Sequence, residues 1–294
     1  MRSTTGRKNI STLLNAQSLL EFPNCKINIG LNVTSKREDG YHNIETIFYP
    51  LPWYDILEVI AGSRNGKSSQ PDTLHLSGIT VPGALTDNIC LKAAALLRKD
   101  FPEISPLTIH LHKTIPAGAG LGGGSADGAF TLLLLDRLFE LGLSARELTT
   151  YALQLGSDCP FFINNTACFA TGRGEQMEHV SIDLSEYTIV LINPGIHVDT
   201  GWAFSQLTPV IPSQKLNELI KQPLTAWRNL IKNDFEEPVL RQYPQIAAVK
   251  ETLYAKGALF AAMTGTGSTV YGIFAKDAPK KMQWENYPLL RIIG

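Results

Sequence analysis

The chain has 294 residues, with 26 basic and 27 acidic side chains and a formal net charge of -1. This balance disfavours a nucleic-acid-binding protein, which usually carries a basic face, and no apolar run is long enough to span a bilayer. The four cysteines are scattered without a C-x-x-C pair, which favours free thiols in a reducing cytosol over disulfides or a zinc site. We therefore expect a cytoplasmic protein of one large or two ordinary domains, with neither a nucleic acid nor a membrane as its partner.

The first 20 residues form a segment of unusual composition. They contain Arg2, Arg7 and Lys8, many Ser and Thr residues, and no acidic residue. Such a composition is compatible with a transit-like segment, but a disordered tail or an expression remnant explains so short a stretch better. We predict a tail over residues 1–20 that takes no part in the chemistry.

A first strand is predicted over residues 25–33, where apolar side chains alternate with polar ones such as Lys26 and Asn28. Its polar side either faces water or lines a cleft. A turn follows, and then Tyr41 and His42 lead into a second predicted strand. On their own these two aromatic residues are as compatible with packing at a strand edge as with binding.

Further elements follow from periodicity and from turn residues. A helix is expected to open at Thr86 or Asp87 as its N-cap. Residues 61–71 are rich in Gly and Ser and read as a loop. The predicted strands lie over 44–49, 53–60, 74–81, 107–112, 166–170, 188–193, 258–263 and 269–274, and the predicted helices over 129–141, 144–155, 226–242 and 246–256.

A glycine-rich loop joins the strand over 107–112 to the helix over 129–141. The stretch from Pro116 to Asp127 holds five glycines, which let main-chain N–H groups approach a ligand with no Cβ in the way. The start of the helix adds unpaired N–H groups and the positive end of its dipole. This combination predicts an anion site, and phosphate is its usual occupant.

Two well-known phosphate loops can be compared with this one. A P-loop requires a lysine after its last glycine, and none is present here. The dinucleotide pattern G-x-G-x-x-G is met by Gly118, Gly120 and Gly123, but it requires a strand after the helix and an acidic residue about 20 positions on. A second helix over 144–155 follows instead, so an NAD-dependent enzyme is the weaker alternative.

Three segments of the chain together resemble the motifs of the GHMP small-molecule kinases. P-A-G-A-G-L-G-G-G-S at 116–125 resembles the second motif of that family, and M-T-G-T-G-S at 263–268 resembles the third. K-I-N-x-x-L-x-V-x-x-x-R-x-D-G-Y-H at 26–42 resembles the first motif of one branch, the kinases of 4-diphosphocytidyl-2-C-methyl-D-erythritol. The resemblance covers about residues 22–280.

The resemblance implies an α+β fold with two domains. Residues 21–180 would form an N-terminal ATP-binding domain of the ribosomal protein S5 domain 2-like kind, and residues 181–294 a C-terminal ferredoxin-like domain. The substrate would lie between them. The chain after Lys281 is short for the family, which leaves the last element of the fold open. Arg173 and Glu175, in the turn before the domain crossover, would be structural.

The resemblance also implies roles for particular residues. Lys26 and Asp158, the latter in G-S-D-C-P-F-F, would be catalytic, with Asp158 as the base, although an Asp in such a turn is otherwise a common turn former. The residues expected at the substrate are Asn28, Tyr41, His42, Thr200 and Phe204, where Phe204 is equally explained as a core aromatic. Those expected at ATP are Pro116, Ala117, Gly118, Ala119, Gly120, Leu121, Gly122, Gly123, Gly124, Ser125, Ala126, Asn88, Ile89, Lys113, Gly265 and Gly267.

The activity implied is transfer of a phosphoryl group from ATP, with Mg²⁺, to the 2-hydroxyl of 4-diphosphocytidyl-2-C-methyl-D-erythritol. Tyr41 and Phe204 would sandwich the cytosine, and His42 would hydrogen-bond to it. Ser125 would reach the β/γ end of the triphosphate or the metal, for which no acidic ligand stands out. Other acceptors (homoserine, mevalonate or a sugar) and a non-catalytic nucleotide-binding module are the alternatives. The sequence leaves open whether the chain is a monomer or a homodimer.

Overall fold

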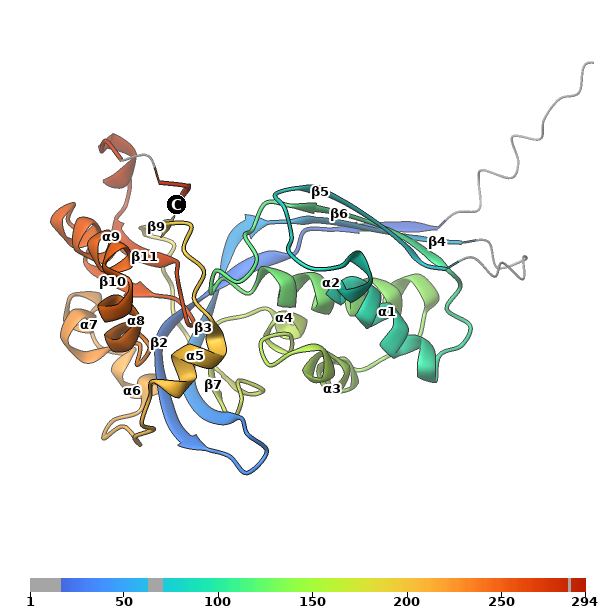
Figure 1. Cartoon of the computed structure of the whole chain (residues 1–294), viewed down its shortest axis with the longest axis horizontal. Helices are drawn as coiled ribbons and strands as arrows, with labels where there is room; N and C mark the ends of the chain where they lie inside the picture. The colour runs from blue at the N-terminus through green and yellow to red at the C-terminus, as the bar shows by residue number, and fades with distance from the viewer. Residues whose placement is uncertain (1–16, 63–70, 285–286) are drawn as a thin grey trace, which may run out of the picture.

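The computed structural model describes residues 17–62, 71–284 and 287–294. Two lobes lie side by side, and a long hairpin runs from one to the other (Figure 1). The hairpin consists of β2 (Asn24–Lys36) and β3 (His42–Tyr54). Of the 13 residues of β2, the first ten are buried, so its polar side does not face water. The alternative of a cleft-lining polar face is the correct one.

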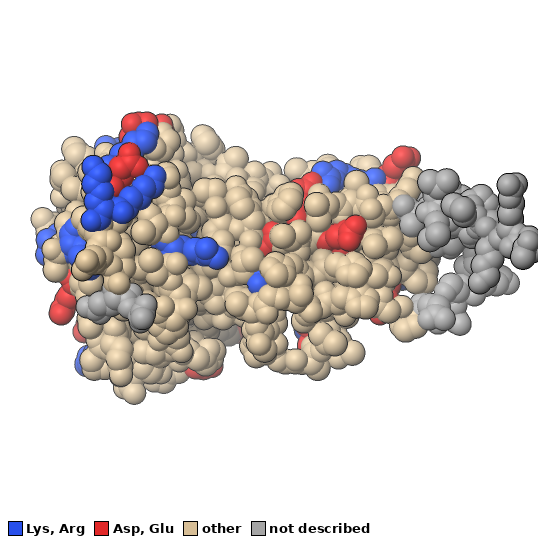
Figure 2. Space-filling view, turned by 90° about the horizontal axis from the view of Figure 1, so that it is seen from above, with Lys and Arg blue, Asp and Glu red and all other residues tan. Residues whose placement is uncertain are grey.

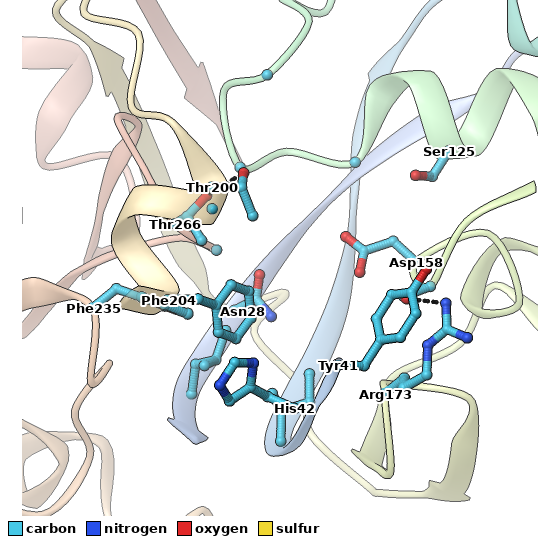
Figure 3. A pocket seen from close by; sticks show the side chains of 18 of the residues that line it. Asn28, Tyr41, His42, Ser125, Asp158, Arg173, Thr200, Phe204, Phe235 and Thr266 are labelled. Carbon is cyan, nitrogen blue, oxygen red and sulfur yellow. Dashed lines mark hydrogen bonds between the residues drawn. The ribbon is translucent and has the colours of Figure 1, made fainter. Parts of the chain in front are cut away.

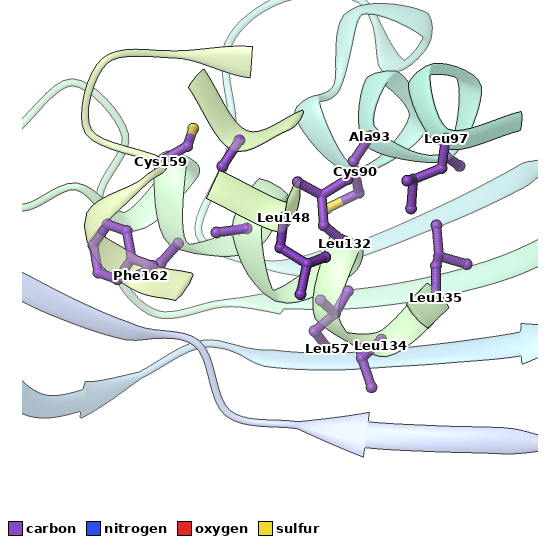
Figure 4. Close-up of a cluster of buried hydrophobic side chains, with 14 of the residues drawn as sticks. Leu57, Cys90, Ala93, Leu97, Leu132, Leu134, Leu135, Leu148, Cys159 and Phe162 are labelled. Carbon is purple, nitrogen blue, oxygen red and sulfur yellow. The ribbon is translucent and has the colours of Figure 1, made fainter. Parts of the chain in front are cut away.

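The first lobe is a sheet covered by helices on one face (Figure 1). The strand order is β1 (Ser18–Glu21), β4 (Ile56–Ala61), β6 (Leu107–Lys113) and β5 (Thr73–Gly78). The helices are α1 (Ile89–Asp100), α2 (Gly123–Phe139), α3 (Ala145–Leu155) and α4 (Phe161–Asn164). Their apolar side chains, among them Leu97, Leu132 and Leu135, form a core against the sheet (Figure 4). Burial of this core supplies the main driving force for folding of the lobe.

Two more sheets complete the molecule. β7 (Cys168–Thr171) and β8 (Gln176–His179) extend the hairpin into a four-stranded sheet, in the order β2-β3-β7-β8. The second lobe is an antiparallel sheet in the order β10 (Phe260–Met263), β11 (Val270–Ala275), β9 (Tyr187–Asn193) and β12 (Leu289–Ile293). Its helices are α5 (Thr200–Ser205), α6 (Leu216–Leu219), α7 (Leu224–Leu230), α8 (Glu236–Gln242) and α9 (Pro244–Ala255).

The prediction of a tail over residues 1–20 is wrong for its last three residues. Residues 18–20 belong to β1, which pairs antiparallel with β4 from Ser18 opposite Ile60 to Glu21 opposite Leu57. Pairing with β4 satisfies the backbone hydrogen bonds of these residues. Nothing in the short Ser/Thr-rich stretch indicates this pairing. Residues 1–16, and the centre of the loop predicted over 61–71, lie outside the described residues.

Most predicted elements shift by a few residues at their ends, and the helix predicted over 129–141 begins six residues earlier, at Gly123. Three further predicted elements are interrupted, shifted or divided. The strand over 53–60 is interrupted at Asp55, whose N–H donates to Pro23 O. The helix expected at Thr86 or Asp87 begins instead at Ile89, after a 3₁₀ turn, with Asn88 as its N-cap. The helix over 226–242 is two helices, because Asn233 and Asp234 pair with β2 and cannot also continue a helix.

The last element, which the sequence left open, is β12, an edge strand paired with β9. All four cysteines are buried and free, as predicted. Within the described ranges, every helix is too short or too polar to cross a membrane. On the face shown in Figure 2, one group of basic side chains of the second lobe lies beside acidic ones, other basic side chains lie apart among uncharged residues, and together they form no continuous basic surface.

Candidate active site

A cavity of about 880 Å³ lies where the hairpin, the glycine loop and the second lobe meet. Its wall includes the glycine loop from Gly118 to Ser125, with Leu121 as the buried exception. Lys26, Asn28, Asp158 and the aromatic residues of both lobes complete the wall (Figure 3). The structure therefore gathers in one hollow residues that are more than 200 positions apart in the sequence.

The glycine loop is shorter than the sequence predicted, because residues 123–127 already belong to α2. Gly118, Gly120 and Gly122 all have positive φ, and α2 begins at Gly123 with Gly122 as its N-cap. A Cβ on Gly120 would lie 2.1 Å from Thr264 O, so only glycine fits there. The Thr264 hydroxyl also donates to Gly120 O at 2.9 Å. The third motif therefore packs directly beside the glycine loop, as expected.

Lys26 and Asp158 face each other across the cavity floor. Lys26 Nζ lies 3.2 Å from Asp158 Oδ2, and the lysine side chain is only 3% exposed, against 35% for the aspartate. The ammonium also donates to Asn28 Oδ1 at 2.6 Å. The stem of the lysine packs under Gly122, where a Cβ would lie 3.0 Å from Lys26 Cγ. The cation is thus fixed between the glycine loop and the partly exposed carboxylate of Asp158.

Asn28 is held by a hydrogen-bond network that joins both lobes. Its Nδ2 donates to Thr46 Oγ1 at 2.9 Å, and that hydroxyl donates to Gly30 O at 2.6 Å. Its main-chain N–H donates to Thr264 Oγ1 at 3.0 Å. These contacts orient the amide so that its oxygen, and not its nitrogen, points toward Lys26. Thr46 and Thr264 are therefore supporting residues that the sequence analysis did not name.

The opposite end of the cavity is aromatic. The His42 ring stacks on Phe204, with centroids 4.7 Å apart and an interplanar angle of 18°, and Phe204 meets Phe235 edge-on at 4.8 Å. Burial, with the charge of Lys36 as the second cause, lowers the pKa of His42. A neutral imidazole offers one donor and one acceptor, as the polar edge of a nucleobase requires. Phe204 thus lines the cavity, in addition to its packing role.

Tyr41 lies on the wall that carries Asp158 (Figure 3). It is 50% exposed, and Arg173 Cζ lies 3.7 Å from its ring centroid. Thr200 lies at the rim, where its hydroxyl is 3.3 Å from that of Thr266. Tyr41 and Phe204 each have a partner other than one another, so the cytosine sandwich stays a prediction. Arg173, which was expected to be only structural, also lines the cavity.

A second, smaller cavity of about 190 Å³ lies on the other side of the glycine loop. Asn88, Ile89, Lys113, Ala117 and Gly124 line it. The sequence assigned all five to the nucleotide, and the structure brings them together. Gly124 lines both cavities, so the loop separates two hollows that meet at the start of α2.

Lys113 is paired with two buried carboxylates that the sequence analysis missed. Its ammonium bonds to Asp127 at 2.6 Å and to Asp55. Asp55 Oδ1 also accepts the N–H groups of Thr114 and Ile115. Burial raises the pKa of Asp127 to about 7, although Lys113 acts to lower it. The only sequence signal was the interruption of a predicted strand at Asp55 by an acidic residue.

Not every predicted ATP residue can offer its side chain. Leu121 and Ala126 are fully buried in the hydrophobic clusters. Pro116 and Gly267 line neither of the two cavities, whereas Gly265 lines the larger one. A Cβ on Gly267 would lie 2.7 Å from Met263 Sδ, so this glycine serves the packing of its turn. No group of three or more His, Cys, Asp or Glu able to hold a metal exists among the described residues.

Family models match both halves of the chain. Residues 88–166 match the GHMP kinases N terminal domain, and residues 216–283 match the GHMP kinases C terminal. The first match spans the glycine loop and Asp158, and the second contains the Thr264 turn. The fold and the site thus define a small-molecule kinase of the GHMP class.

Close relatives place the chain more narrowly. A protein of Bacteroides fragilis named 4-diphosphocytidyl-2-C-methyl-D-erythritol kinase is 47% identical over 91% of this chain and 96% of its own length. One of the same name from Cytophaga hutchinsonii is 49% identical over 87% and 92%. The chain belongs to the GHMP kinase family, in the branch of the proteins named 4-diphosphocytidyl-2-C-methyl-D-erythritol kinase. The predicted α+β fold with two domains is thereby confirmed.

Solved structures agree. A crystal structure of a 4-(cytidine 5'-diphospho)-2C-methyl-D-erythritol kinase superposes with a TM-score of 0.72 at 29% identity, covering 90% of this chain and 93% of that one. A homoserine kinase from Cytophaga hutchinsonii shares the fold, with a TM-score of 0.61 at 14% identity over 88% of each chain.

Proposed function

We propose that the chain transfers the γ-phosphoryl group of ATP to the 2-hydroxyl of 4-diphosphocytidyl-2-C-methyl-D-erythritol, in the non-mevalonate route to isoprenoid precursors. The observation that carries the proposal is the Lys26–Asp158 pair, at 3.2 Å, in one cavity with the glycine loop and with an aromatic end formed by His42 and Phe204. The names of the close relatives support the choice of acceptor.

Each part of the cavity has a role in this reaction. The N–H groups of the glycine loop and of the start of α2 bind the phosphates of ATP. Asp158 takes the proton of the acceptor hydroxyl as that oxygen attacks the γ-phosphorus and the bond to the β-phosphate oxygen breaks. Lys26 neutralises charge that develops on the transferred group. Its contact with Asn28 holds it in position for this.

Mg²⁺ accompanies ATP in this proposal. Asp127, an acidic residue close to the loop, is engaged by Lys113, and Ser125 lines the cavity at the start of α2. Mg²⁺ characteristically keeps several waters and binds through phosphate oxygens with few protein ligands. A single hydroxyl ligand from Ser125 is compatible with this coordination. Ser125 is the residue that would hold the metal, which when bound would neutralise negative charge on the phosphates.

The nucleotide base would lie in the smaller cavity, beside Asn88, Ile89 and Lys113. The cytosine would lie at the aromatic end, between Tyr41 and Phe204, with His42 reading its polar edge. The division into domains at residues 21–180 and 181–294 belongs to the same proposal, as do a cytoplasmic location and a monomeric or homodimeric state. The substrate then spans the junction of the two lobes.

A panel of acceptors tests the proposal. ATP consumption by the purified protein is measured with 4-diphosphocytidyl-2-C-methyl-D-erythritol, homoserine, mevalonate and a hexose. We expect turnover with the first acceptor alone, because a small aliphatic alcohol makes no use of His42 and Phe204. Turnover with another acceptor in its place would establish a different GHMP kinase. Calorimetry then measures the binding of ATP and of NADH. Binding of ATP supports a kinase with either acceptor, whereas binding of NADH would indicate an NAD-dependent enzyme.

A further inference from the structure

Arg173 combines three properties that its place in a turn does not explain. It lies between β7 and β8, yet it lines the large cavity. Its Nε–H is buried without a hydrogen-bond acceptor in the described part of the chain. No carboxylate of the described residues lies within ion-pair distance of its guanidinium, although other arginines, such as Arg98, have such a partner. A buried donor without an acceptor costs free energy, so some other contact holds this side chain in place.

The contact is with Tyr41. Arg173 Cζ lies 3.7 Å from the centroid of the tyrosine ring, well within the range of a cation–π interaction. A ring has two faces, and the guanidinium covers one of them. Tyr41 is half exposed and lies immediately before β3, at the end of the hairpin turn. The arginine therefore limits where this ring can lie.

The arginine is itself anchored beside the catalytic aspartate. Its Nη2 donates to Ser157 Oγ at 3.1 Å, and Ser157 immediately precedes Asp158. Its main-chain N–H donates to Glu175 Oε2 at 2.6 Å, which holds the turn. Figure 3 shows Tyr41, Arg173 and Asp158 grouped on one wall, opposite His42 and Phe204.

We propose that Arg173 is a positioning residue that stacks behind Tyr41 and fixes this ring, through Ser157, relative to Asp158. The inference rests on the proposed function, in which Tyr41 contacts the cytosine. Base binding and placement of the 2-hydroxyl then depend on one chain of contacts. Arg173 acts on the acceptor through Tyr41 and leaves the affinity for ATP unchanged.

A double-mutant cycle tests this dependence. Arg173→Ala and Tyr41→Ala are each expected to raise KM for the cytidine acceptor about 10-fold, within the range of cation–π and stacking energies. The double variant should show about the same 10-fold rise, because Arg173 has nothing to position once the ring is gone. Arg173→Lys, which keeps the charge but loses the flat stacking face, should lie between wild type and Arg173→Ala. KM for ATP should not change.

Ser157→Ala provides a second, gentler variant. It should raise the same KM about 3-fold, and the rise should vanish in the Arg173→Ala background. Lys36→Ala is the matched control, because Lys36 is another cation that lines the cavity, and its effect should multiply with that of Tyr41→Ala.

Two results would overturn the inference. One is a product of effects, about 100-fold, in the Arg173→Ala/Tyr41→Ala variant, since Arg173 would then act on the acceptor independently. The other is wild-type behaviour of Arg173→Lys, since charge alone would then suffice. Failure of the proposed function has a different signature, namely a wild-type protein that does not turn over the cytidine acceptor, and it would remove the basis of this inference as well.

Discussion

Two buried lysines lie on either side of the glycine loop, and their surroundings differ. Lys26 faces one carboxylate, Asp158, whose side chain is 35% exposed, and an uncharged amide. Lys113 faces two carboxylates, Asp55 and Asp127, whose side chains are 0% and 3% exposed. The charge of Lys113 is thus neutralised by buried carboxylates, whereas the charge of Lys26 remains available to a ligand in the large cavity.

This difference assigns unequal duties to the two sides of the loop. On the Lys113 side, Asp55 also binds the N–H groups of Thr114 and Ile115, which lead into the loop. The triad formed by Lys113, Asp55 and Asp127 therefore builds the loop. On the Lys26 side, a cation and an accessible carboxylate are placed for chemistry. We expect substitutions on the two sides to separate activity from stability.

The largest effect is expected for Asp158→Asn. The amide cannot accept the proton of the acceptor hydroxyl, so kcat should fall by about 10²–10⁴-fold, with KM for ATP unchanged. Steady-state kinetics with the cytidine acceptor measure this. Asp183→Asn, at an exposed position, is the control and should behave as wild type. A kcat near that of wild type for Asp158→Asn would show that Asp158 is not the base.

The two lysines should respond in opposite ways to substitution by methionine. Lys113→Met leaves two buried carboxylates unpaired, and breaking a buried ion pair typically costs about 3–5 kcal/mol of stability. Lys26→Met should cost about 1 kcal/mol, because Asp158 can turn to water, yet it should abolish most turnover. Urea unfolding and kinetics on both variants measure the split. The surface pair Lys276–Glu186 supplies the control, Lys276→Met, with a change below about 1 kcal/mol. Equal stability losses for both lysines would contradict the comparison.

Glycine substitutions sharpen the picture of the loop between the lysines. Gly120 has φ +78° and a Cβ there would lie 2.1 Å from Thr264 O, whereas a Cβ on Gly124 meets nothing within 4 Å. Gly120→Ala should destabilise the protein by about 2–4 kcal/mol, the sum of a left-handed backbone and a clash. Gly124→Ala, in the first turn of α2, should be neutral or slightly stabilising. Thermal unfolding of both variants measures these changes in stability. Wild-type stability of Gly120→Ala would contradict the prediction and would mean that the third motif can move away from the loop.

The side of the loop that carries Lys26 and Asp158 could be predicted from sequence as a candidate site, because its signals are local. Glycine spacing, and the context of Lys26 and Asp158, lie within short motifs. Secondary structure also followed local rules where capping was strong, as at Ser144, which forms a capping box with Glu147 at the start of α3. These features require no knowledge of which strands pair.

The structural side was not predictable, because it is built from long-range pairs. Asp55 and Lys113 are 58 residues apart, and nothing near either residue marks the other. The break at Asn233, which pairs with Leu31, has the same cause: tertiary pairing overrides a helical pattern. Arg173 is predicted to be structural from its place in the turn before the domain crossover, and no local signal marks its contact with Tyr41, which is 132 positions away in the sequence.

The triad of Lys113, Asp55 and Asp127 also predicts that the stability of the protein depends on pH. The pKa of Asp127 in the folded protein is raised to about 7, first by burial. A carboxyl whose folded pKa lies above its unfolded value stabilises the fold below the unfolded pKa, near 4, and this contribution is lost as the pH rises through about 7. Between pH 5.5 and pH 8, the free energy of unfolding of the wild type should therefore fall by about 1–2 kcal/mol more than that of Asp127→Asn. Urea titrations at both pH values measure the difference. Asp183→Asn should follow the wild type, and equal slopes for Asp127→Asn and wild type would show that Lys113 holds Asp127 fully ionised.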